Sequence, residues 1–147
     1  MIWKSNPSID SLNATGINTM VHHIGIEFIE VGDDYLIAKM PVDHRTIQPM
    51  GLLHGGASVA LAETIGSVAS VVVQENPFEK AVVGVEINAN HLSSAREGYV
   101  FGKVTPIKVG RKIHVWNITI TDGNGKLICI SRLTTTLLDK KTPPGPQ

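Results

Sequence analysis

One acidic residue interrupts a long apolar run in the middle of the chain. A His-Gly-Gly junction at 54–56 opens this run, and Glu63 is the only charged residue between Arg45 and Glu75. Glutamate is almost never fully buried without a partner or a function. A partly desolvated carboxylate has a raised pKa and is a stronger base at neutral pH. Glu63 is therefore a candidate catalytic carboxylate, either as a general base toward water or as a nucleophile toward a carbonyl carbon.

The glycines of the same junction predict a site for a carbonyl oxygen. Pro49 and Gly51 indicate an irregular segment, and good helix formers begin after His54. If the helix starts at Gly55, the N–H of that residue is one of the unpaired donors at the positive end of the helix dipole. Without a Cβ, Gly55 lets a ligand approach this N–H, which would stabilise a developing oxyanion. His54 and Gln48 are candidates for additional side-chain donors.

The spacing of these residues predicts a site made by two chains. Glu63 follows Gly55 by eight residues, which is roughly 12 Å along a helix at about 1.5 Å per residue. A carboxylate at that distance does not reach the same reacting atom from the same helix. We therefore expect a homodimer in which Glu63 faces the helix start of the other chain. Ser67, one turn beyond Glu63, is a candidate to bind its carboxylate or a water, or else to bond its own backbone.

Hydrophobic patterns and turn residues predict an α+β fold. The central helix is expected from about Gly55 to near Asn76-Pro77 and buried along most of its length, after a short helix from Ser8 to about Thr15. Two strands joined by Gly32-Asp33-Asp34 form a predicted hairpin before the central helix. An antiparallel meander is expected after it. The predicted strands cover residues 24–31, 35–42, 81–92, 99–107, 112–121 and 127–138.

Length, charge and cysteine content limit the classes of protein. The 147 residues suit one domain, expected over 1–139, with a disordered tail over 140–147. The formal net charge is zero, which gives no indication of a nucleic-acid partner. No uninterrupted apolar stretch of 18 residues and no signal-like N-terminus is found, so we expect no membrane association. The single cysteine, Cys129, fits a reducing cytoplasm. His22-His23 lack partners at metal-ligand spacing, so no metal is expected.

Several motifs in order resemble one family. The segment MPVDHRTIQPMGLLHGGASVALAETIGS is similar to the signature of the hotdog-fold acyl-CoA thioesterases, and VVGVEINANHL, SAREG, VWNITI and SRLTT extend the similarity from Ile2 to about Leu138. The small bacterial branch that hydrolyses aromatic acyl-CoA esters is the most similar. The resemblance implies a sheet wrapped around the central helix and two chains that pair into one continuous sheet. It also implies pairing of dimers into a tetramer, and no cofactor, since CoA is part of the substrate.

The resemblance also implies two substrate-binding segments. One borders the acyl and pantetheine tunnel and comprises Gly84, His91, Leu92, Ser93 and Ser94. The other is a basic turn that meets the CoA phosphates and comprises Lys108, Val109, Gly110, Arg111, Lys112 and Ile113. Three cations beside a backbone turn suit a nucleotide bisphosphate. A solvated basic turn without a ligand is the alternative interpretation.

Three other functions remain open from the sequence. A proofreading thioesterase that clears misacylated aryl carrier proteins would share every catalytic residue named above. Hotdog dehydratases act on 3-hydroxyacyl thioesters, but they pair a histidine with an acid in a different arrangement. A non-catalytic acyl-CoA-binding module would tolerate the loss of Glu63, whose presence disfavours that interpretation.

Overall fold

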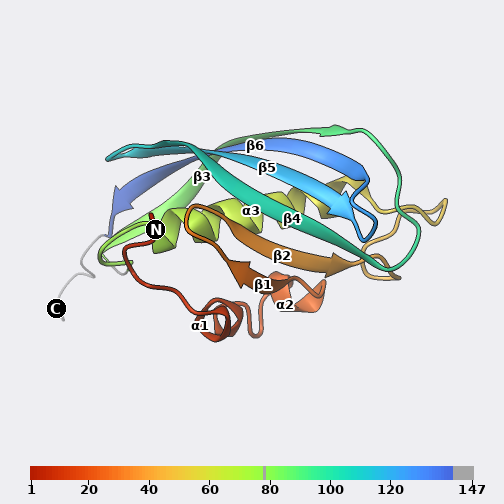
Figure 1. Cartoon of the computed structure of the whole chain (residues 1–147), viewed down its shortest axis with the longest axis horizontal. Helices are drawn as coiled ribbons and strands as arrows, with labels where there is room; N and C mark the ends of the chain where they lie inside the picture. The colour runs from red at the N-terminus through yellow and green to blue at the C-terminus, as the bar shows by residue number, and fades with distance from the viewer. Residues whose placement is uncertain (78, 141–147) are drawn as a thin grey trace, which may run out of the picture.

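A six-stranded antiparallel sheet curves around one long helix, α3 (Gly55–Val72), in the computed structural model, which describes residues 1–77 and 79–140 (Figure 1). The fold is the predicted α+β hotdog arrangement. Two short helices, α1 and α2, lie beside the first strand at the lower side of Figure 1. The remaining elements are α1 (Ile9–Ala14), α2 (Met20–His23), β1 (Glu27–Val31), β2 (Leu36–Pro41), β3 (Lys80–His91), β4 (Tyr99–Val109), β5 (Ile113–Asp122) and β6 (Leu127–Asp139).

The strand order corrects one prediction. The sheet runs β1-β2-β4-β5-β6-β3, so the meander contains only β4, β5 and β6. Strand β3 does not join β4; it pairs with β6 at the far edge, where Lys80 lies opposite Asp139. The cause is α3, which follows β2 and carries the chain along the inside of the sheet to its other edge. Among the described strands β3 therefore has one neighbour and one free edge.

Helix α3 fills the space inside the sheet. None of the residues 57–73 is exposed, and the fully buried side chains lie against the strands. Its length and composition would suit a membrane span, but 44% of that window is buried inside the protein. The helix begins at Gly55 as predicted and ends at Val72, short of the predicted end near Asn76-Pro77. Three consecutive β-branched valines (71–73), which have low helix propensity, lie at this end.

The N-terminal segment confirms one helix and corrects one strand. Ser8 caps α1 and forms a capping box with Ser11. The strand expected from Ile24 begins only at Glu27, because the preceding residues form α2 and Gly25 adopts a φ of 77°. The predicted disordered tail lies outside the described residues except for Lys140.

Candidate active site

The start of α3 is held by its own capping histidine. His54 has an extended backbone, and its Nδ1 accepts a hydrogen bond of 2.7 Å from the Gly56 N–H. A Cβ on Gly56 would lie 2.9 Å from this ring, so the glycine permits the cap. With Nδ1 as the acceptor, a neutral imidazole carries its proton on Nε2. The cap thus leaves His54 with a donor for a ligand.

The Gly55 N–H donates to no acceptor within the described part of the chain. The ring of His91, at the end of β3, lies against the Cβ position of Gly55. A Cβ on Gly55 would come within 2.8 Å of His91 Nε2. Packing against His91 therefore favours glycine here, and the N–H that was predicted as the oxyanion donor is unpaired in the described residues.

A cavity of about 430 Å³ opens beside this donor. It brings Gln48 and Gly55 together with the predicted acyl-tunnel residues 91–94. Two predicted residues do not line it: His54 lines a different cavity, and Gly84 lies against Glu63. The side-chain oxygen of Gln48 accepts from the Met50 N–H, which leaves the amide NH₂ as a donor. Its lining residues are Gln48, Leu52, Leu53, Gly55, Ser58, His91, Leu92, Ser93, Ser94 and Ile128. Of these, Leu52, Leu53, Ser58 and Ile128 were not predicted.

Glu63 lies on α3 beside the free-edge strand β3. A Cβ on Gly84 would overlap Glu63 Oε1, so the predicted tunnel residue Gly84 makes room for the carboxylate. Glu63 is half-buried, and burial raises the pKa of its carboxyl, as the sequence predicted. Neither Glu63 nor Ser67 forms a hydrogen bond or ion pair within the described residues. The predicted contact between Ser67 and Glu63 is thus not formed inside one chain.

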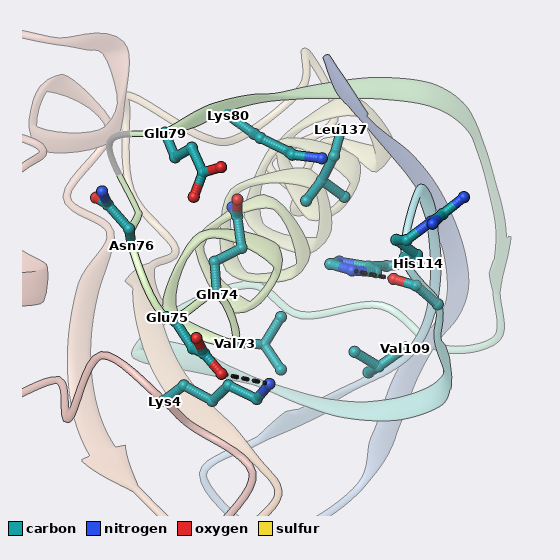
Figure 2. A pocket seen from close by; sticks show the side chains of 12 residues that line it. Lys4, Val73, Gln74, Glu75, Asn76, Glu79, Lys80, Val109, His114 and Leu137 are labelled. Carbon is teal, nitrogen blue, oxygen red and sulfur yellow. Dashed lines mark hydrogen bonds and ion pairs between the residues drawn. The ribbon is translucent and has the colours of Figure 1, made fainter. Parts of the chain in front are cut away.

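The basic turn lies at the other end of α3. Lys108, Arg111 and Lys112 are exposed, and Val109, Gly110 and Arg111 line a cavity of about 470 Å³ with residues that follow the helix (Figure 2). No group of three or more His, Cys, Asp or Glu side chains that could hold a metal occurs in the described ranges 1–77 and 79–140.

Three groups of predicted residues are therefore spaced along α3. The Gly55 group lies at its start, Glu63 with Ser67 and Gly84 at its middle, and the basic turn at its end. One chain does not bring these groups together, since Glu63 is roughly 12 Å from Gly55 along the helix axis.

Comparisons with known proteins place this geometry in a family. The family model described as "Thioesterase superfamily" matches residues 50–129, which include Gly55, Glu63 and the basic turn. The chain belongs to the thioesterase superfamily. A thioesterase structure from Haemophilus influenzae superposes with a TM-score of 0.92 at 49% identity, over 98% of this chain and 99% of the other.

Two curated relatives of this thioesterase span nearly its full length. The 1,4-dihydroxy-2-naphthoyl-CoA hydrolase of Escherichia coli is 55% identical over 94% of this chain and 100% of the relative. Proofreading thioesterase EntH of Cronobacter turicensis is 48% identical over 94% of this chain and 99% of the relative. The chain is thus a thioester hydrolase with the hotdog fold, and the dehydratase and non-catalytic alternatives are disfavoured.

Proposed function

We propose that this thioesterase hydrolyses 1,4-dihydroxy-2-naphthoyl-CoA to 1,4-dihydroxy-2-naphthoate and CoA, a step of menaquinone biosynthesis. The substrate assignment rests on the 55% identity to the E. coli hydrolase of that name, over the whole length of the relative. The free N–H of Gly55 and the half-buried Glu63 carboxylate support the reaction class, because acyl transfer needs an oxyanion donor and a base or nucleophile.

The thioester carbonyl docks against the Gly55 N–H, with donors from His54 Nε2 and the Gln48 amide beside it. Glu63 drives the attack on the carbonyl carbon, by activating water or by attacking directly. The C–S bond breaks, the oxygen of water ends in the carboxylate product, and the CoA sulfur leaves as thiol or thiolate. The reaction requires water but no cofactor or metal.

The active site is composite and belongs to a homodimer. Glu63 lies beside Gly84 of β3, and β3 has a free edge at which Val83 and Val85 are exposed. Pairing of β3 with the same strand of a second copy extends the sheet and turns Glu63 toward the other chain. Unpaired hydrophobic edge strands favour such pairing. We also propose that two such dimers assemble into a tetramer. The proposed location of the protein is the cytoplasm.

The proposed path of the substrate runs along the two segments that the sequence predicted to bind it. The acyl group and pantetheine arm pass the cavity lined by His91, Leu92, Ser93 and Ser94, and the CoA phosphates meet the basic turn. In the dimer the turn that serves one site is contributed by the chain that contributes Glu63, since the turn lies beyond Glu63, at the end of α3 away from that chain's own Gly55.

Free-thiol release from a panel of aromatic and aliphatic acyl-CoAs tests the proposal. We expect turnover of dihydroxynaphthoyl-CoA and a loss of roughly 10²-fold or more in kcat for Glu63→Gln, the scale of a lost acid–base group. The matched control is Glu30→Gln, an exposed carboxylate on β1 that should leave turnover unchanged. Full activity of Glu63→Gln would contradict the composite site.

A carrier-protein substrate is the second candidate, and it rests on the 48% identity to EntH. The two functions differ in the group that bears the thioester. Comparing kcat/KM for the same aryl group on CoA and on an aryl carrier protein separates them. We expect the CoA thioester to be preferred; preference for the carrier-protein thioester would assign the proofreading role instead.

A further inference from the structure

Four buried polar side chains form a cluster at the end of α3 that is farthest from Gly55. Ser70 of α3 lies at its centre, with His114 and Trp116 from β5 and Thr135 from β6. Ser70 Oγ is 2.7 Å from Trp116 Nε1, 2.7 Å from Thr135 Oγ1 and 3.1 Å from His114 Nδ1. None of the four residues is more than 2% exposed. A fully satisfied polar network in a core specifies geometry more strictly than apolar packing does.

The chemistry of the partners fixes the proton positions in this cluster. His114 Nε2 lies 3.0 Å from the Gly110 carbonyl oxygen, which only accepts, so Nε2 carries a proton. Burial lowers the pKa of His114, so the ring is neutral and its Nδ1 accepts from the Ser70 hydroxyl. Trp116 and Thr135 then both donate to Ser70 Oγ. The hydrogen bonds form one directed chain from the core to the Gly110 carbonyl.

That carbonyl belongs to the basic turn. The Gly110 N–H donates to the Ile113 carbonyl at 3.0 Å, and the Lys112 carbonyl accepts from the backbone of β6 at 2.9 Å. The N–H groups of Arg111 and Lys112 meet no acceptor in the part of the chain that the structure describes. The internal bonds therefore hold three of the turn's carbonyls, those of Gly110, Lys112 and Ile113, and leave two N–H groups and the cations for an anion.

Figure 2 shows the His114 ring between the end of α3 and the turn, with its bond to the Gly110 oxygen in the cavity wall. We propose that His114, anchored by Ser70, is a positioning residue that fixes the 110–113 backbone in the shape that receives a phosphate of the CoA nucleotide. This inference rests on the proposed use of acyl-CoA. It assigns the core cluster a task in nucleotide recognition that is distinct from the chemistry at Gly55 and Glu63.

The test is a pair of amide variants, each of which mimics one ring nitrogen, that separate the two hydrogen bonds of the ring. In His114→Asn the amide replaces Nδ1 and keeps the bond to Ser70 but loses Gly110. In His114→Gln the amide reaches the Nε2 position and keeps Gly110. We expect the KM for acyl-CoA and the Kd of free CoA to rise roughly tenfold in His114→Asn, the scale of one hydrogen bond to a charged group. His114→Gln keeps the Gly110 bond but loses the Ser70 anchor, so it should give a smaller rise than His114→Asn, with kcat unchanged in both.

Thioesters of pantetheine, which lack the nucleotide, provide the discriminating substrate. Their KM should be the same in wild type, His114→Asn and His114→Gln. The matched control is Ser131→Ala, which removes another buried hydroxyl, one bonded to the Asn88 carbonyl, and should not change the ratio of the two KM values. Equal losses for CoA and pantetheine thioesters in His114→Asn would show a purely structural role and overturn the inference.

Two outcomes separate this inference from the proposed function. If wild-type protein hydrolyses CoA and pantetheine thioesters with the same KM, the hydrolase stands and the inference falls. If it hydrolyses neither, both fall. An independent readout is the tautomer of His114 in the wild-type protein by ¹⁵N NMR. We expect the neutral form with the proton on Nε2; a proton on Nδ1 would contradict the directed chain of hydrogen bonds.

Discussion

The two ends of α3 treat their polar groups in opposite ways. At its start, the Gly55 N–H has no acceptor among the described residues, and the cavity beside it is open to solvent. At its end, the buried polar atoms of Ser70, His114 and Trp116 are all paired. Glu63, between them, is half-buried and has no partner in the described chain. The unpaired groups at the start of α3 are available to bind a substrate, while the hydrogen-bonded groups at its end stabilise the fold.

Gly55→Ala, at the start of α3, should have the largest effect on catalysis. The new Cβ would lie 2.8 Å from His91 Nε2 and would crowd the space through which a ligand approaches the helix start. We expect kcat to fall by roughly 10²-fold or more, the cost of losing one oxyanion-hole donor. Steady-state thiol release measures it.

The control for Gly55→Ala is Gly123→Ala, at a turn glycine whose added Cβ would be no closer than 4.0 Å to another side chain. This variant should keep wild-type kcat. An active Gly55→Ala variant would show that the helix start does not bind the thioester carbonyl.

Two serines of α3 compare the two kinds of environment directly. Ser70→Ala should lower the free energy of unfolding by about 1–3 kcal/mol, because the buried Trp116 N–H loses its acceptor. Ser67→Ala should change it by less than about 0.5 kcal/mol, because its hydroxyl has no bond to lose in the described chain. Urea unfolding at equal protein concentration measures both. Similar losses for the two variants would remove the distinction.

The sequence predicted the site at the start of α3 better than the polar cluster at the end of α3, for a physical reason. Glu63 was recognisable because a lone charge in an apolar run has no structural explanation nearby, and Gly55 because glycine at a helix start exposes a donor. Ser70 and His114 are 44 residues apart, and each has an ordinary local interpretation on a helix or a strand. Only the tertiary fold shows that they meet.

Strand pairing was the other limit of the sequence. The alternating patterns located most strand ends to within one or two residues, yet the partner of β3 was wrong. Hydrophobic periodicity describes which face of a strand is buried, not which strand lies next to it. The position of β3 matters for function, because its free edge puts Glu63 where a second chain can use it.

The smallest predicted effect is that of Glu63→Gln on stability. Its direction is opposite to the effect on catalysis: the variant should be more stable but less active. Burial raises the pKa of the Glu63 carboxyl in the folded state above the ordinary 4.5. The folded protein therefore binds this proton more tightly than the unfolded chain does, and the stability from that proton is present below pH 4.5. As pH rises through the raised pKa, ionisation of Glu63 destabilises the folded state. Glutamine does not ionise, so Glu63→Gln should have a higher Tm than wild type at pH 8.

The pH dependence of that Tm difference identifies its cause. The difference should shrink as the pH falls toward 4.5, because the wild-type carboxyl becomes protonated and neutral. Glu97→Gln, at an exposed carboxylate in the β3–β4 connection, is the matched control and should give a smaller difference in Tm. If Glu63→Gln instead lowers the Tm at pH 8, the ionised carboxylate is stabilised in the folded dimer by a partner from the second chain. The dimer would then stabilise the ionised carboxylate of Glu63, instead of destabilising it by burial.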